Sequence, residues 1–352
     1  MKTLAVAFLS SLLIAVTLTP VVRKAALSLG LADDREAERK VHRSRVSRLG
    51  GLVMFVAFLL PLAALYFYDN AVAKAVFGDM GRFSGFLLLA AAAFFIGLSD
   101  DLKPLSPRLR LAGQFAIGAA SFFAGFRFES VSLFGQLFHF SPVVAFAVTV
   151  LWFALIINAI NLIDGLDGLA GGIVSIATAT VFVVSVMHGA VLLSVTTALL
   201  LGSLAGFLYH NFKPSCIFMG DGGSYFLGYA IAALTLDASM KSAAACVVLL
   251  PLLALGVPIF DTVFAFFRRL WRGIPITHAD KEHIHHQFLR KTTSTYLFHS
   301  KMLLKVHFKD LIKNLIIGQV ILITLIRFEF CRGCFSYGTK GDDFFIFIQK
   351  SG

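Results

Sequence analysis

Five short groups of acidic, amide, glycine and histidine residues interrupt a chain that is otherwise very apolar. They are Asp100-Asp101, 158–167 (NAINLIDGLD), 219–224 (MGDGGS), Asp261 and 280–286 (DKEHIHH). Carboxylates at the edge of an apolar layer are costly, so they normally mark an ion path or a catalytic site. Two adjacent carboxylates repel each other and favour a shared proton or a divalent cation. The residue types therefore indicate chemistry on cations or phosphates.

The group at 158–167 has polar residues at every third position. On a helix, Asn158, Asn161 and Asp164 would lie along one face. Gly165 and Gly168 would then let the backbone bend close to a ligand. Polar side chains that join helices could explain one asparagine, but they explain poorly four polar residues in ten. The pattern favours a functional surface.

The group at 219–224 precedes an apolar segment. Its glycines can aim successive N–H groups at a phosphate, and a helix N-terminus adds partial positive charge. Asp221 can hold a metal ion that bridges phosphate oxygens. The alternative is an ordinary glycine turn in which Ser224 or Asp221 caps the following helix.

Basic residues follow in one stretch, from Arg268 to His283, His285 and His286. Arginine suits a bidentate grip on phosphate, and histidine can donate to phosphoryl oxygens or ligate a metal. Arg268 and its neighbouring arginines could equally determine membrane topology. The histidines lack the further ligand set of a zinc site. Carboxylates, glycine turns and basic residues, without a Ser-His or Cys-His pair, indicate Mg²⁺-assisted phosphoryl transfer.

The composition indicates which elements must position these residues. The 352 residues are 58% hydrophobic, the mean hydropathy is +0.82, and apolar runs of about twenty residues recur. These features exclude a soluble globule and predict an all-α polytopic membrane protein. The net charge of +11 lies in short loops between spans, which argues against nucleic acid as a partner. The four cysteines form no disulfide framework, and Cys331-x-x-Cys334 alone is a weak zinc pattern.

Length and periodicity predict about nine to ten spans. Nine are placed at 3–22, 50–68, 83–99, 109–125, 142–163, 169–187, 189–209, 224–236 and 242–260. The first is expected to be a retained helix rather than a signal peptide, because it lacks a small-residue cleavage site and leads into further spans.

Charge bias predicts the orientation. The 23–48 loop holds eight Lys and Arg residues, so we expect it in the cytoplasm and the N-terminus outside. Alternation then places all five polar groups at the cytoplasmic face, where separate loops could form one site. The segment 126–141 predicts a small hairpin on the outer surface, and Asp237 is expected to be a solvated charge in an outer loop.

Six motifs occur in order: RxxERKVHxxxVxRLGG (35–51), DDLKPLSPRLRLAGQ (100–114), NAINLIDGLDGLAGG (158–172), FMGDGGSYFLGY (218–229), PIFDT (258–262) and ADKEHIHHQFL (279–289). Together they resemble the polyprenyl-phosphate N-acetylhexosamine-1-phosphate transferases. The resemblance covers residues 1–289, which we expect to be the integral-membrane transferase domain. Residues 290–352 differ in composition, which indicates an atypical tail from a shifted reading frame or a replaced C-terminus.

The resemblance implies transfer of a sugar 1-phosphate from a UDP-sugar to undecaprenyl phosphate in a bacterial inner membrane, with release of UMP. ADKE before HIHH resembles the UDP-N-acetylglucosamine branch. The resemblance also implies Mg²⁺ or Mn²⁺ at Asn161 and Asp221, with Asp100 and Asp101 beside the reacting phosphates. The expected site residues are catalytic Asp100, Asp101, Asp164 and Asp167, substrate-binding Asn158, Arg268, His283, His285 and His286, and metal-binding Asn161 and Asp221.

A phosphate monoester has a second pKa near about 6, so undecaprenyl phosphate is already largely dianionic at neutral pH. A strong general base is not required. We therefore expect Asp100 and Asp101 chiefly to place the metal and the nucleophile.

Three other functions are alternatives for such a chain. One is a phospho-N-acetylmuramoyl-pentapeptide transferase. Another is an ion-coupled transporter, whose acids would lie near the bilayer midplane. A CDP-alcohol phosphotransferase is disfavoured, because only Asp164-Gly165 matches its pattern. A homodimer is kept as a candidate assembly.

Overall fold

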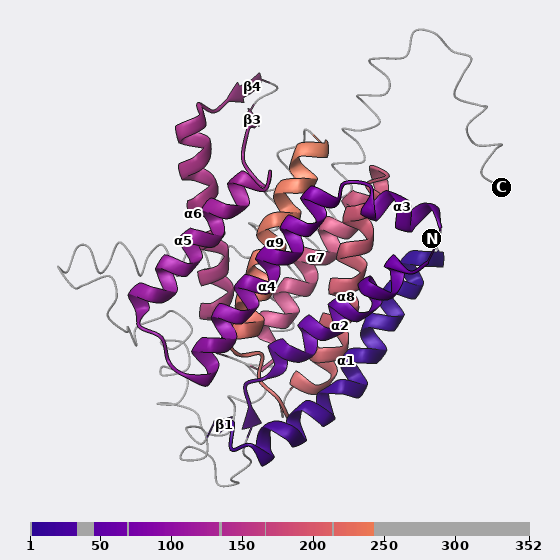
Figure 1. The fold of residues 1–352 in the computed structure, drawn as a ribbon, viewed down its shortest axis with the longest axis vertical. Helices are drawn as coiled ribbons and strands as arrows, with labels where there is room; N and C mark the ends of the chain where they lie inside the picture. The colour runs from indigo at the N-terminus through magenta and orange to yellow at the C-terminus, as the bar shows by residue number, and fades with distance from the viewer. Residues whose placement is uncertain are drawn as a thin grey trace, which may run out of the picture. The chain divides into compact units, whose positions relative to one another are not determined.

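The computed structural model describes residues 2–33, 46–68, 70–133, 136–165, 167–212 and 215–242. Within these ranges the chain forms nine α-helices and four short strands (Figure 1). The helices are α1 Lys2–Ser28, α2 Gly50–Tyr66, α3 Ala71–Phe77, α4 Met80–Leu102, α5 Pro107–Phe123, α6 Pro142–Ile163, α7 Leu169–Met187, α8 Val191–Asn211 and α9 Gly220–Ser242. The predicted class, a polytopic helical membrane protein, is confirmed.

Five of these helices are long and apolar enough to cross a membrane: α1, α4, α6, α7 and α8. The bent pair α2 and α3 would make a sixth span. The described residues thus hold fewer such helices than the nine to ten spans predicted, and the predicted span at 242–260 lies outside them. The expected orientation, with the N-terminus outside, stays a prediction.

Helix bounds agree with the sequence prediction in the middle of the chain and differ at several ends. The spans predicted at 142–163 and 169–187 coincide with α6 and α7. The span predicted at 83–99 continues to Leu102, so Asp100 and Asp101, expected at the end of this span, lie in the last turn of α4. The span predicted at 224–236 lies within α9 but is too short, because α9 begins at Gly220 and has 23 residues.

Local sequence sets several helix starts. Ser106 caps α5 through a hydrogen bond from the Leu109 N–H (3.3 Å), and Pro107 occupies the first turn. A Ser-Pro pair also begins α6. A proline costs little in the first turn, because its missing N–H would have no intrahelical partner there. Asp79 caps α4 in the same way as Ser106, accepting from the Arg82 N–H at 3.1 Å.

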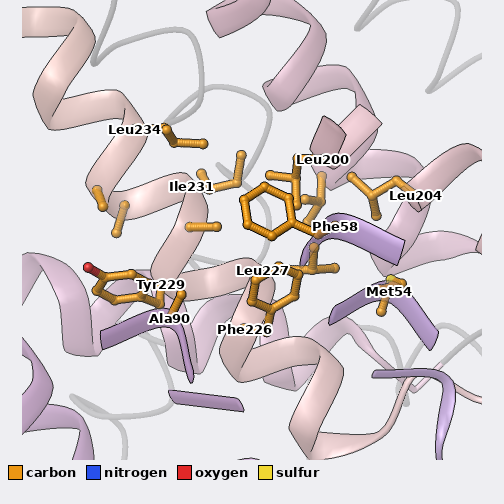
Figure 2. Close-up of a cluster of buried hydrophobic side chains, with 14 of the residues drawn as sticks. Met54, Phe58, Ala90, Leu200, Leu204, Phe226, Leu227, Tyr229, Ile231 and Leu234 are labelled. Atoms are coloured by element: carbon orange, nitrogen blue, oxygen red, sulfur yellow. The ribbon is translucent and has the colours of Figure 1, made fainter. Parts of the chain in front are cut away.

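Helix α9 is surrounded by other helices. It packs against α2, α4, α6 and α7, and its residues from Gly222 to Ala238 are buried. Figure 2 shows Phe226 and Leu227 of α9 among Met54 and Phe58 of α2. The Phe58 and Phe226 rings lie 5.6 Å apart, edge to face, an arrangement that aromatic pairs prefer. Burial on all sides fits a helix that is apolar around its whole circumference.

Two strand pairs lie at opposite ends of the helices (Figure 1). Strands β3 (Ser130–Leu133) and β4 (Gln136–His139) form an antiparallel hairpin, as the alternation in 126–141 predicted. Strands β1 (Ala32–Asp33) and β2 (Val46–Ser47) pair antiparallel at the other end. This second pair was not predicted, because each strand has only two residues.

The prediction that Asp237 is a solvated charge in an outer loop is wrong. It lies on α9, is 3% exposed and pairs with Arg82 of α4, with Arg82 Nη2 2.7 Å from Asp237 Oδ1. The Arg82 guanidinium also lies over the Phe126 ring, 5.2 Å from its centre. A buried carboxylate is tolerated when it is paired, and a partner 155 positions away along the chain is invisible to a local pattern.

Candidate functional site

The acidic groups predicted to form one site meet where α9 begins. Asp100 and Asp101 lie in the last turn of α4, Asn161 in the last turn of α6, and Asp164 is the C-cap residue of α6. Asp221 lies in the first turn of α9. The site is therefore assembled from the C-terminal ends of two helices and the N-terminal end of a third.

Backbone pairing to β2 and α2 fixes the segment that leads into α9. Ser47 pairs in parallel with Ile217, and the Phe218 N–H donates to the Ser47 carbonyl at 2.8 Å. The Gly50 N–H donates to the Phe218 carbonyl at 2.9 Å. The chain then turns into α9 at Gly220, whose φ of 74° suits glycine.

Glycines allow α2 and α4 to approach the first turn of α9 very closely. A Cβ on Gly51 would lie 2.2 Å from the Gly223 nitrogen, and a Cβ on Gly97 would lie 2.2 Å from the Asp221 carbonyl oxygen. Small residues at such crossings are typical of helix packing in membranes. These glycines set the distance between the acids of α4 and those of α9.

Asp101 binds the start of α9. Its Oδ1 accepts from the Asp221 N–H (2.9 Å) and its Oδ2 from the Gly222 N–H (2.8 Å). We predicted that the glycine-rich segment would offer such N–H groups to a phosphate as a loop before the helix. In the structure these two groups belong to the first helical turn and bind a protein carboxylate, and a contact of the segment with phosphate stays a prediction.

Asp100 points to different partners. It is buried, its Oδ1 accepts from the Leu105 N–H at 2.7 Å, and its Oδ2 lies 3.1 Å from Arg110 Nη1. In the structure Asp101 accepts from two backbone N–H groups, whereas Asp100 pairs with Arg110 and its side chain also contacts the Asp221 side chain. The expected sharing of a proton or a cation between Asp100 and Asp101 stays a prediction. Arg110 was missed, although it lies in the DDLKPLSPRLRLAGQ motif, because its distance from Asp100 depends on the turn between α4 and α5.

Asn161 and Asp221, the predicted metal-binding pair, lie in direct contact. Asn161 Nδ2 donates to Asp221 Oδ1 (2.5 Å) and to Ser224 Oγ (2.9 Å). Ser224 is buried and in turn donates to the Asp221 carbonyl at 3.2 Å. Sequence reasoning treated Ser224 only as a capping residue, so this contact with Asn161 was missed.

Asp164 lies beside the same groups. Burial among protein atoms raises the pKa of Asp164 well above its usual value, and the negative charges of Asp221 and Asp101 raise it further. A hydrogen bond from the Gly220 backbone and the charge of Arg48 oppose this rise. Three carboxylates that repel one another are the electrostatic environment in which a cation is favoured.

Asn158 is held within the protein. Its amide forms a reciprocal pair with Gln114 of α5 and donates to the Ala154 carbonyl at 2.9 Å. Gln114 is buried and was not predicted as a site residue. The pair joins α5 to α6, and the substrate-binding role of Asn158 stays a prediction.

Asp167 faces a different neighbour from Asp164. Its Oδ1 accepts from Ser215 Oγ at 2.9 Å. Next to it, Gly168 begins α7 with a φ of 74°, and its N–H donates to Asn211 Oδ1 at 2.9 Å. Asn211 also donates to the Ile217 carbonyl at 2.8 Å. These bonds tie the loop after α6 to the segment before α9.

The remaining predicted residues, Asp261, Arg268, His283, His285 and His286, lie outside the described residues. Their proposed contacts with donor phosphates therefore stay predictions.

The donor atoms fit a hard cation. In the part of the chain that the structure describes, no three His, Cys, Asp or Glu side chains form a metal-binding group. Mg²⁺ does not need such a group, because it usually keeps several waters and takes one or two carboxylates together with substrate phosphates. The Asp221 carboxylate and the Asn161 amide supply oxygen atoms of the type that Mg²⁺ binds.

Comparisons with known proteins agree on one family. The family described as "Glycosyl transferase family 4" matches residues 83–239. A "Probable undecaprenyl-phosphate N-acetylglucosaminyl 1-phosphate transferase" from Bacillus subtilis is 37% identical over 286 residues, covering 81% of this chain and 76% of that protein.

Two further relatives match shorter parts of the chain. A "Decaprenyl-phosphate N-acetylglucosaminephosphotransferase" from Mycobacterium leprae is 36% identical over 154 residues, 38% of this chain and 39% of that protein. A "Phospho-N-acetylmuramoyl-pentapeptide-transferase" from Levilactobacillus brevis is 45% identical over 87 residues, 25% of this chain and 27% of that protein. The relatives thus differ in the lipid and in the sugar that their names specify.

Proposed function

This chain belongs to glycosyl transferase family 4, and on that premise we propose that it transfers N-acetylglucosamine 1-phosphate from UDP-N-acetylglucosamine to undecaprenyl phosphate. A lipid phosphate oxygen attacks the phosphorus that carries the sugar. The bond from that phosphorus to the bridging oxygen breaks, and UMP leaves. The product is a diphosphate that links the sugar to the lipid, formed in a bacterial inner membrane.

One observation carries this proposal: acids and an amide from three motifs far apart in the sequence meet at the start of α9. Asp101, Asn161 and Asp221 come from α4, α6 and α9, and hydrogen bonds connect all three. Phosphoryl transfer depends mainly on positioning and charge neutralisation rather than on a covalent nucleophile. A cluster of carboxylates at the ends of membrane helices supports this chemistry.

Asp221 and Asn161 would hold Mg²⁺, with Asp164 beside them. When bound, the cation would neutralise charge on phosphate oxygens. The protein residues do the positioning: Asn161 orients the Asp221 carboxylate, and Arg110 balances the charge of buried Asp100. Undecaprenyl phosphate needs no strong base, because it is already largely dianionic at neutral pH. His283, His285, His286 and Arg268 are proposed to contact the donor.

The Bacillus subtilis relative supports N-acetylglucosamine and undecaprenyl phosphate, since it matches the larger part of both chains. The mycobacterial relatives are named for decaprenyl phosphate, and the Levilactobacillus relative is named for a muramoyl-pentapeptide. Both alternatives rest on matches to less than half of this chain. They define the substrates with which the proposed one must be compared.

The test uses the purified full chain in detergent with Mg²⁺. Undecaprenyl or decaprenyl phosphate is combined with UDP-N-acetylglucosamine or UDP-N-acetylmuramoyl-pentapeptide, and lipid product and UMP are measured. We expect equal amounts of both products with UDP-N-acetylglucosamine and undecaprenyl phosphate. Product only with the muramoyl-pentapeptide would overturn the donor assignment, and solute transport in vesicles without UMP would overturn the enzyme.

Two variants make the test specific. Asp221→Ala should abolish turnover, because it removes the proposed cation ligand. Glu129→Ala should retain it, because Glu129 lies in an exposed pair with Arg127, whose Nη2 is 2.8 Å from Glu129 Oε1. Equal activity of the two variants would show that the acidic cluster is not the site.

A further inference from the structure

We infer that Asp101 is a positioning residue, which acts by fixing the first turn of α9 and thereby the direction of Asp221, and which does not itself bind a cation or take a proton. The inference rests on the proposed function, because Asp221 is the group being positioned. It changes the role expected of Asp101 from the sequence, where Asp100 and Asp101 were treated as one catalytic pair.

The first step is the geometry of the contact. Both Asp101 oxygens are engaged: one accepts from the Asp221 N–H at 2.9 Å and the other from the Gly222 N–H at 2.8 Å. The first N–H groups of a helix have no intrahelical partner, and a negative charge there is favoured by the helix dipole. Asp101 therefore works as a helix cap supplied by another helix, 120 residues earlier in the chain.

Glycines lie around the Asp101 carboxylate, at the start of α9. A Cβ on Gly220 would lie 2.7 Å from Asp101 Oδ2, and a Cβ on Gly222 would lie 3.4 Å from the same atom. Gly97 on α4 similarly leaves room for the Asp221 carbonyl. The glycines of the 219–224 segment thus admit a protein carboxylate to the helix end, in addition to letting the chain turn.

The next step connects the cap to the site. One of the two capped N–H groups belongs to Asp221 itself, so the cap fixes the backbone from which that side chain extends. The Asp221 carboxylate then meets Asn161 Nδ2 at 2.5 Å. If the first turn of α9 opened, Asp221 would lose its fixed direction while keeping its charge. Asp101 can therefore affect catalysis without contact with a substrate.

A second contact between the same helices shows that their register is fixed at both ends. Asp101 at the C-terminal end of α4 binds the N-terminal end of α9, and Arg82 at the N-terminal end of α4 pairs with Asp237 near the other end of α9 at 2.7 Å. The two helices are antiparallel. A slip of α9 along α4 would break both contacts, so Asp101 sets the final position of the turn within a register already constrained elsewhere.

Asp100 provides the matched control. It is adjacent in sequence and also buried, but it accepts from the Leu105 N–H and pairs with Arg110. Its side chain contacts the Asp221 side chain, but among the described contacts it accepts from no backbone N–H of α9. Asp100→Asn leaves both bonds from Asp101 to the α9 backbone in place, so the amides at the start of α9 should stay protected, whatever the substitution does to turnover.

The first measurement is amide hydrogen exchange of the 219–227 segment in the purified full chain, without substrate or metal. Asp101→Ala should increase exchange at Asp221 and Gly222 at least about tenfold, since both bonds are lost. Asp101→Asn keeps one acceptor oxygen, so its exchange should be intermediate. Asp100→Asn should match the wild type. Unchanged exchange in Asp101→Ala would overturn the inference.

The second measurement is turnover of Asp101→Asn, which preserves shape and one hydrogen bond. We expect kcat to fall about tenfold, which corresponds to about 1.4 kcal/mol, with KM for the donor within about threefold and the pH profile unchanged. Loss of the acid limb of the profile would identify Asp101 as a proton acceptor and overturn the inference. Unaltered kcat together with faster exchange would also overturn it.

The exchange measurement needs no turnover, so the two proposals can fail separately. If the wild-type chain forms no lipid product from any of the tested substrates, the proposed function fails. The exchange pattern would still decide whether Asp101 holds the start of α9.

Discussion

Asn161 Nδ2 lies 2.5 Å from Asp221 Oδ1 and thereby joins the last turn of α6 to the first turn of α9. The two residues are 60 positions apart in the sequence. The same amide nitrogen lies 2.9 Å from Ser224 Oγ. Asn161 is thus both a neighbour of the proposed cation ligand and the group that orients it.

Asn161→Ala should lower the affinity for Mg²⁺ more than it lowers the stability of the folded protein. It removes a candidate oxygen ligand and leaves Asp221 without its amide donor, so the Mg²⁺ concentration for half-maximal UMP release should rise at least about tenfold, in line with the usual effect of lost supporting contacts. Ser224→Ala removes the bonds from Asn161 Nδ2 and to the Asp221 carbonyl but no proposed cation ligand, so it should shift this concentration less. Identical Mg²⁺ curves for Asn161→Ala and the wild type would argue against a cation at this place.

Arg110→Ala should impair activity and stability together, because it leaves the buried Asp100 carboxylate without the cation 3.1 Å away. Loss of one partner of a buried pair generally costs several kcal/mol. Arg110→Lys keeps the charge but not the planar geometry and should be milder. Arg108→Ala, at an exposed arginine two residues earlier, is the control, and turnover with thermal unfolding in detergent is the measurement. Equal effects of Arg108→Ala and Arg110→Ala would contradict the role of the Asp100 pair.

Gly51→Ala should destabilise the protein by about 1 to 3 kcal/mol, the usual cost of overpacking. The added Cβ would lie 2.2 Å from the backbone nitrogen of Gly223, so α2 and α9 must separate at the site. Gly172→Ala in α7 is a matched control, since its Cβ would meet nothing within 4 Å. The comparison is made by thermal unfolding in detergent, and a Gly51→Ala variant as stable as Gly172→Ala would show that the helices can yield there.

Asp237→Ala should lower stability while leaving the acidic site intact. It breaks a pair whose side chains are 25% (Arg82) and 5% (Asp237) exposed. Because the remaining Arg82 is partly hydrated, the cost should be about 1 to 3 kcal/mol, less than for a fully buried unpaired charge. Glu129→Ala breaks the Arg127 pair, whose side chains are 43% and 48% exposed, so it should cost under about 1 kcal/mol. The measurement is again thermal unfolding. The kcat of folded Asp237→Ala should equal that of the wild type, and a changed kcat would show coupling between the two ends of α9.

The length and spacing of apolar runs were sufficient to predict those helices whose ends carry a capping or polar residue. The 142–163 span was predicted with its observed bounds, because a Ser-Pro start and a polar end delimit a continuous apolar run. The helix predicted at 224–236 was too short, because the glycines from Gly220 to Gly223 indicated a loop. Glycines lower helix propensity, but here they are needed for close packing against Gly51 and Gly97.

The residue types of the site also came from the sequence alone. The chain determined that Asp101, Asn161, Asp164 and Asp221 would be polar groups at helix ends, and that the protein would be a helical membrane protein. It could not determine which group each carboxylate binds. The partners of Asp101, Asp100 and Asp237 were decided by the packing of α4 against α9 and α5. Contacts between residues distant in sequence depend on helix register and on the space that glycines leave. Neither can be read from a local sequence pattern.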